Sequence, residues 1–208
     1  MSDPNTFSER GQEPYRDIPT DPDAFLQWAS RQPREAGRFE LSNGKVTRTV
    51  INVTRRHAVV CSNISYDLMR QLDRDRYVIA VGDFAVRTGN GVRNPDVVVD
   101  EAKPSGSELW TSKPIFIAEV LSPSTSALDF TTKQRECTAI PSLQTYLVCG
   151  QDEPRAWVWA RKSDGSWPID AAMIEGRDAS IPLSGLDIEV SMAAIFRGIP
   201  DAPTPEPC

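Results

Sequence analysis

A mixed α/β domain with a central sheet is the fold that this sequence predicts, and three segments carry the prediction. Residues 115–121 form a nearly unbroken apolar run of β-forming residues, which is typical of a strand buried on both faces. Residues 55–73 carry apolar side chains at helical spacing and predict an amphipathic helix. Asn43-Gly44 lies between two extended runs and is a strong signal of a β-hairpin. Helix and strand patterns in one chain favour helices packed on a sheet.

With 208 residues, the chain is long enough for one domain with its own hydrophobic core. Residues 1–19 are polar, acidic and contain proline, so we expect a flexible N-terminal segment. Residues 20–198 carry the periodic patterns and predict the folded domain. Residues 199–208 are rich in proline and predict a flexible C-terminal tail.

The first elements are a short helix, the hairpin and the long helix. Asp21-Pro22 predicts the start of a helix that reaches about residue 31, because proline suits the first helical position and apolar residues follow at helical spacing. The arms of the hairpin lie on either side of Asn43-Gly44. The long helix begins where the apolar spacing changes from strand-like to helical.

Strand patterns dominate the rest of the chain. They are separated by Gly89-Asn90-Gly91, which predicts a turn, and by residues 101–113, which predict a loop. Ser124 or Thr125 can cap a helix that runs to about residue 139. The expected strands are 77–81, 84–87, 97–99, 115–121, 143–149 and 157–160, and one or two helical turns are expected at 192–196.

The charge of the chain is uneven. The net charge is −6, which argues against binding nucleic acid by bulk electrostatics alone. Residues 25–95, however, carry twelve basic and six acidic side chains. This basic stretch predicts either a surface that contacts phosphates or an ordinary solvated basic face, and the sequence leaves both open.

Cysteine and histidine are too sparse for a zinc site of the usual kind. Four cysteines include no Cys-x-x-Cys pair, and His57 is the sole histidine. We expect reduced thiols and a cytoplasmic protein that does not enter a membrane, because no apolar run approaches the roughly 20 residues of a span and the first residues do not resemble a secretory signal. Carboxylates are therefore the best candidates for catalysis.

Two acidic residues stand in apolar surroundings. Glu119 interrupts the buried strand at 115–121, where an ionised carboxylate is costly unless it is paired, hydrogen-bonded or bound to metal. Asp96 opens the apolar run 97–99. Carboxylates at strand ends are candidate ligands of Mg²⁺ or Mn²⁺. The alternatives are a buried ion pair between Glu119 and an arginine, and a turn capped by Asp96.

Asp129 and Lys133 lie four residues apart on the helix expected after Ser124. They could form a surface ion pair worth about 0.3–0.5 kcal/mol. Alternatively, their helix face looks back at the strand end that carries Glu119, where a lysine could orient a water or neutralise charge on a phosphate.

Several short segments together are similar to one known family. They are Phe39-Glu40-Leu41, Asn43-Gly44, His57, Pro95-Asp96-Val97-Val98-Val99, Glu119-Val120-Leu121-Ser122-Pro123-Ser124-Thr125, Asp129, Lys133, Ile140-Pro141-Ser142-Leu143-Gln144 and Tyr146-Leu147-Val148. In order and spacing they resemble the Uma family of restriction-type endonucleases, members of the PD-(D/E)XK nuclease superfamily. The resemblance runs from about residue 22 to 198.

The resemblance implies a restriction-endonuclease-like core, with a central mixed β-sheet flanked by α-helices. It implies that Asp96, Glu119 and the Val120 carbonyl bind one or two Mg²⁺ ions, with Mn²⁺ as an alternative. Glu40 would be an outer ligand or a supporting acid, and Lys133 would take part in catalysis. The implied activity is the hydrolysis of DNA phosphodiester bonds by a metal-activated water in a bacterial protein that could act as a homodimer.

The chain departs from the superfamily pattern at Leu121, where the lysine two residues after the glutamate is expected. Its role would pass to Lys133. Cys137 and Thr145 also replace an aromatic and an acidic residue that are common in the family. These departures keep a second function open, in which the chain is a catalytically degenerate module that binds nucleic acid or protein. A nuclease for structured or single-stranded nucleic acid is a third.

Substrate contacts are expected at the start of the long helix and on the helix after the buried strand. His57 follows Arg55-Arg56, so a phosphate contact is plausible there. A structural or substrate-positioning role suits His57 better than that of a general base. Asp129 is the remaining candidate for substrate binding.

Overall fold

The structure is a computed structural model that describes residues 17–49, 53–102, 107–121 and 127–200. The side chains of residues 34, 49 and 127–130 lie outside this description. Ile18 and Ile199, near the two ends of the described chain, are both buried. Most residues of the two predicted flexible termini lie outside the described residues. No helix within the described ranges is both long and apolar enough to span a bilayer.

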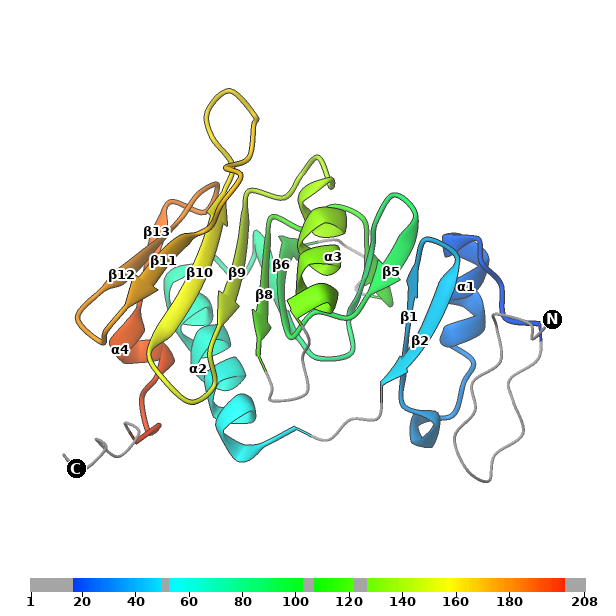
Figure 1. The fold of residues 1–208 in the computed structure, drawn as a ribbon, viewed down its shortest axis with the longest axis horizontal. Helices are drawn as coiled ribbons and strands as arrows, with labels where there is room; N and C mark the ends of the chain where they lie inside the picture. Colours follow the sequence, from blue (N-terminus) through cyan, green and yellow to red (C-terminus); the bar gives the residue numbers. More distant parts are fainter. Residues whose placement is uncertain (1–16, 50–52, 103–106, 122–126, 201–208) are drawn as a thin grey trace.

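A mixed six-stranded sheet forms the centre of the fold (Figure 1). Its strand order is β11-β10-β9-β8-β6-β3. β8 and β9 are parallel, and every other neighbouring pair is antiparallel. The strands are β3 (Tyr77–Val81), β6 (Val97–Glu101), β8 (Phe116–Val120), β9 (Thr145–Cys149), β10 (Arg155–Ala160) and β11 (Ala172–Glu175).

A smaller five-stranded sheet has the order β2-β1-β5-β4-β7. It contains the predicted hairpin, in which Ser42 pairs with Lys45 and both turn residues, Asn43 and Gly44, have positive φ. A separate two-stranded ribbon follows the central sheet. The strands are β1 (Arg38–Ser42), β2 (Lys45–Thr49), β4 (Ala85–Arg87), β5 (Gly91–Arg93), β7 (Trp110–Thr111), β12 (Ser180–Leu183) and β13 (Ile188–Ser191).

Four α-helices in the described part of the chain pack around the sheets. α2 (Arg55–Gln71), α4 (Met192–Ile195) and the β12–β13 ribbon cover one face of the central sheet through a single large apolar cluster. α3 (Ala127–Thr138) lies on the other face, between the two sheets in the view of Figure 1. α1 (Pro22–Ala29) and a 3₁₀ turn (Arg34–Ala36) pack on the small sheet.

The buried strand β8 separates the two sides of the core. Phe116, Ala118 and Val120 belong to the α2 cluster, and Ile117 belongs to the cluster under α3. Because side chains alternate along a strand, Glu119 faces the α3 side together with Ile117. The strand pattern therefore places a carboxyl group on the face that α3 covers.

The predicted helices and most predicted strands are confirmed, with differences at the small sheet. The predicted loop 101–113 contains β7, whose two residues pair with β4, and the predicted turn at residue 91 opens β5. Such short strands form through pairing with distant residues and have little local signal. β11, β12 and β13 were also not expected, since they are short, and β12 carries Pro182 in a two-stranded ribbon.

Gly91 allows β5 to lie against β1. A β-carbon at this position would overlap the Leu41 carbonyl oxygen. We expect Gly91→Ala to lower the free energy of unfolding by about 1–3 kcal/mol, as overpacking does. Gly89→Ala is the matched control because a β-carbon there meets nothing within 4 Å, and its effect should stay within about 0.5 kcal/mol. Denaturant unfolding of both variants checks this, and equal stability would contradict the close approach.

Candidate active site

Asp96 and Glu119 come together at one end of the central sheet. In the antiparallel register of β6 and β8, Val97 pairs with Ala118, so one further residue places Asp96 opposite Glu119. The Val120 N–H donates to Asp96 Oδ2 at 2.8 Å, which fixes the two strand ends to each other. The three residues predicted to bind metal are therefore neighbours, and Asp96 accepts a bond across the sheet rather than capping a local turn.

One oxygen of the Glu119 carboxyl group lacks a hydrogen bond. This atom, Oε1, is fully buried and has no partner within the described part of the chain. Burial raises the pKa of Glu119 to about 8, while the Lys133 ammonium opposes the rise and the Asp96 carboxylate reinforces it. An unpaired buried oxygen costs free energy in a structural role, and a cation removes this cost.

Lys133 reaches the same place from α3. Its Nζ lies 3.3 Å from Glu40 Oε1, and its charge acts on Glu119. The helix face that carries Lys133 thus looks back at the strand end, as one of the two sequence interpretations expects. Asp129 belongs to the same helix, but its side chain is among those that lie outside the described residues. Leu121, at the superfamily lysine position, packs partly buried against the cluster under α3.

Glu40 is held from three directions. Arg93 Nη1 lies 3.0 Å from Glu40 Oε2, and the Asn94 N–H donates to Oε1 at 3.0 Å. Lys133 is the third partner. These contacts bring an acid from the small sheet next to the strand ends of the central sheet, where the resemblance implies a supporting acid.

Arg93 is a residue of the candidate site that sequence reasoning missed. It is 3% exposed, and its Nε also contacts Glu136 Oε2 at 2.7 Å. The buried arginine that was considered as a partner of Glu119 thus bridges Glu40 and Glu136 instead. Its only signal in the sequence is an arginine among β-forming residues shortly before Asp96, a pattern too common to identify it.

The three residues at the start of α2 have different surroundings. His57 is 7% exposed, and its Nε2 lies 3.2 Å from Asp96 Oδ2. Arg55 is exposed, and Arg56 contacts Asp152 at 3.2 Å on the surface. The Arg55 side chain is thus open to solvent, whereas the His57 ring is directed to the Asp96 carboxylate.

The donor atoms at this end of the sheet suit a hard cation. Asp96 and Glu119 offer carboxylate oxygens, which Mg²⁺ and Mn²⁺ prefer. One atom each of His57, Cys61 and Asp96 also lie within 4.8 Å of one another. However, Cys61 and Asp96 approach opposite nitrogens of the His57 ring, and burial raises the pKa of the Cys61 thiol far above its usual value. Because these two contacts lie on opposite sides of the ring, the three donors do not converge around one ring nitrogen as a shared metal site requires.

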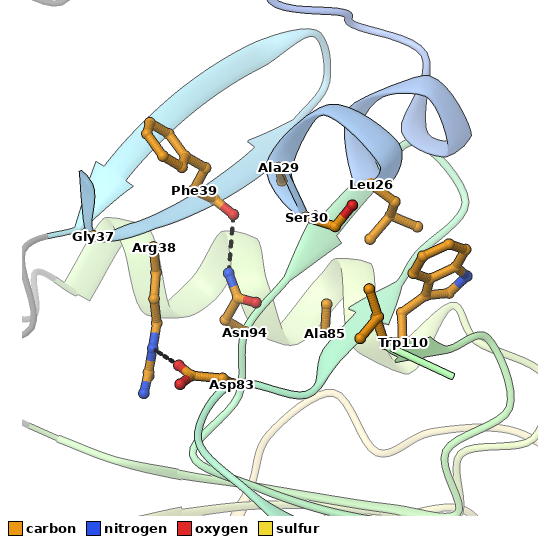
Figure 2. Close-up of a pocket in the computed structure, with 11 residues that line it drawn as sticks. Leu26, Ala29, Ser30, Gly37, Arg38, Phe39, Asp83, Ala85, Asn94 and Trp110 are labelled. Atoms are coloured by element: carbon orange, nitrogen blue, oxygen red, sulfur yellow. Dashed lines mark hydrogen bonds and ion pairs between the residues drawn. The ribbon is translucent and has the colours of Figure 1, made fainter. Parts of the chain in front are cut away.

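A separate cavity of about 230 Å³ lies between α1 and the small sheet (Figure 2). An Arg38–Asp83 ion pair of 2.7 Å closes one side, and the Asn94 side chain donates to the Phe39 carbonyl at 2.9 Å. None of the predicted site residues lines the cavity. Asn94 connects it to the site, because the Asn94 backbone N–H binds Glu40.

Similar proteins have been found by sequence and by structure. Two uncharacterized Synechocystis proteins, slr1290 and sll1609, are 27% and 26% identical to this chain over 181 and 167 residues. The alignments cover 86% and 78% of this chain and 92% and 93% of those proteins.

A crystal structure from Anabaena variabilis, titled "a putative nuclease belonging to DUF820", is 17% identical to the chain, with a TM-score of 0.68. The superposition covers 86% of this chain and 98% of that one. This likeness confirms the predicted fold class, a central mixed sheet with flanking helices.

The model of the Uma2 family, described as "Putative restriction endonuclease", matches residues 22–193. This range contains the six-stranded and the five-stranded sheet together with Glu40, Asp96 and Glu119. The match confirms the resemblance found in the sequence. The chain belongs to the Uma2 family.

Proposed function

We propose that this protein is a metal-dependent endonuclease that hydrolyses phosphodiester bonds in DNA. The observation that carries the proposal is the position of Asp96 opposite Glu119, whose buried Oε1 has no partner among the described residues. A purely structural pair of acids would be expected to have cationic or hydrogen-bonding partners for each buried oxygen. Membership of the Uma2 family supports the same reaction class.

Asp96, Glu119 and the Val120 carbonyl would hold Mg²⁺ or Mn²⁺, and Glu40 would support them from the small sheet. When bound, such a cation lowers the pKa of a coordinated water and stabilises charge on the phosphate. Arg93 holds Glu40 in place through their 3.0 Å contact. The acid is thereby available to orient a water next to the strand ends.

Lys133 replaces the lysine that the superfamily pattern places at position 121. Its ammonium group lies beside Glu40, and its charge reaches Glu119, so it can donate to a phosphate oxygen in the same place. Arg55, exposed at the start of α2, can contact a phosphate of the bound strand. The net charge of −6 implies that binding depends on such local basic residues.

A catalytically degenerate module is the second candidate. It is favoured by one observation, the apolar packing of Leu121 at the position where the superfamily has lysine. Such a module would keep the fold and bind nucleic acid or protein without efficient hydrolysis. The two candidates differ in whether the carboxylates are needed for a reaction.

We expect the protein to nick supercoiled plasmid in the presence of Mg²⁺ or Mn²⁺, and EDTA to stop the reaction. Asp96→Asn and Glu119→Gln each remove a ligand charge, so the rate should fall at least about 100-fold. Glu101→Gln is the matched control, since Glu101 is an exposed acid at the last position of β6, the strand that follows Asp96. Equal nicking by all proteins would indicate a contaminant, and no nicking by any of them would favour the degenerate module.

We expect Lys133→Met to lower the cleavage rate about 100- to 1000-fold, because one positive group that stabilises charge on the phosphate is lost. Mn²⁺ affinity should change much less than the rate, since Lys133 is not a ligand. Lys162→Met, at an exposed lysine after β10, is the control and should cleave normally. A full rate in Lys133→Met would assign the role of the missing lysine to another group.

Glu119→Gln should stabilise the metal-free protein, and the gain should grow with pH. The pKa of Glu119 is raised from about 4.5 to about 8 by folding, so ionisation costs stability only as the pH rises through this range. Thermal unfolding in EDTA should show little difference between the variant and wild type near pH 4.5. At pH 8 the variant should be more stable by at least about 1 kcal/mol. An equal difference at both pH values would contradict the buried charge.

A further inference from the structure

His57 connects the first turn of α2 to the end of β6. The Thr54 side chain caps α2 by accepting a bond from the His57 N–H at 3.1 Å, and it donates to buried Gln151 at 2.7 Å. Gln151 follows β9, so the helix start is tied to the central sheet. The backbone of His57 is thus anchored at the strand ends where Asp96 and Glu119 meet.

The two ring nitrogens of His57 have different partners. Nε2 lies 3.2 Å from Asp96 Oδ2, and Nδ1 lies 3.5 Å from Cys61 Sγ, one turn further along α2. A hydrogen on Nε2 would point toward this carboxylate, whose oxygens are acceptors. Because burial raises the pKa of the Cys61 thiol, the thiol keeps its hydrogen and can donate to Nδ1.

Both contacts to Asp96 end on the same oxygen. Oδ2 accepts a hydrogen bond from the Val120 N–H at 2.8 Å and lies 3.2 Å from His57 Nε2, whereas Oδ1 receives no hydrogen bond from the residues that the structure describes. One strand and one helix thus hold this carboxylate from two directions. They leave Oδ1 available on an acid that is already oriented.

We infer that His57 is a positioning residue that orients the Asp96 carboxylate for a divalent cation, with the Cys61 thiol holding the imidazole in its Nε2–H form. This inference rests on the proposed role of Asp96 as a metal ligand. It differs from the phosphate contact that the sequence suggests for His57, because the ring is buried and both of its nitrogens are engaged within the protein. Partners of this kind tune ligands in known metal sites.

The first experiment uses the fact that His57 is the sole histidine. In protein labelled with ¹⁵N-histidine, the two ring signals belong to one residue without further assignment. We expect Nε2 at the position of a protonated ring nitrogen and Nδ1 at that of an unprotonated one, in metal-free protein near pH 7. Cys61→Ala should increase the Nδ1–H form, and Cys61→Ser, which keeps a donor, should not. An Nδ1–H or doubly protonated ring in wild type would overturn the inference.

The second experiment measures Mn²⁺ binding without DNA, from the electron paramagnetic resonance signal of free Mn²⁺. His57→Leu should weaken binding about 10- to 100-fold, the usual effect of removing a partner of a metal ligand. His57→Gln places an amide donor near the position of Nε2 and should restore most of the affinity. Ile64→Val, at a buried position on the same helix, is the control for a general loss of stability and should bind as wild type does.

The outcomes separate this inference from the proposed function. If wild type binds no Mn²⁺ in a manner that depends on Asp96, the proposed metal dependence fails and the inference fails with it. If wild type binds Mn²⁺ and His57→Leu binds equally well, the positioning role alone is overturned. If His57→Gln binds no better than His57→Leu, His57 is not acting as a donor, and the inference is also wrong.

Discussion

Balancing the charge of carboxyl groups away from water is the physical constraint on which this site depends. Glu40 and Glu136 are buried or nearly so, and each would be costly without a cation. Arg93 lies between them and contacts both. The arginine has to leave the solvent together with the acids, and this requires β5 to pack closely on β1 at Gly91. The small sheet is therefore the scaffold of an ion-pair network as well as part of the core.

Glu119 is the exception within this network, and the exception gives the site its chemical character. Arg93 contacts Glu136 and Glu40, and Lys133 contacts Glu40. Glu119 lies near these cations but keeps one oxygen without a partner in the described structure. The protein thus tolerates a local loss of stability at the residue that we propose as a metal ligand. Stability and the proposed metal binding make opposite demands at this residue.

The elements that surround the site come from both sheets and two helices. Asp96 and Glu119 belong to the central sheet, Glu40 to the small sheet, Lys133 to α3 and His57 to α2. Each of these side chains is positioned by strands or helices that are distant from it in the sequence. The site can therefore form only when the whole domain has folded.

Much of this arrangement could be predicted from the sequence, and the parts that could not depend on long-range pairing. The apolar run around Glu119 and the hairpin at Asn43-Gly44 have strong local signals, and both are confirmed. The position of Asp96 opposite Glu119 requires the register of β6 and β8, which no local pattern gives. Arg93 was missed for the same reason, because an exposed and a buried arginine look alike until the strand partners are known.

The short link between the two sheets has a consequence for where the length of the chain can vary. β5 ends at Arg93, which contacts Glu40, and β6 begins at Val97. Only Asn94, Pro95 and Asp96 join these two strands, and Asp96 lies opposite Glu119. Insertions here would move one acid relative to the others. Residues 161–171, the turn between β10 and β11 that projects at the top of Figure 1, bear no such relation to the site. Length variation should thus be tolerated at that turn and excluded from the link.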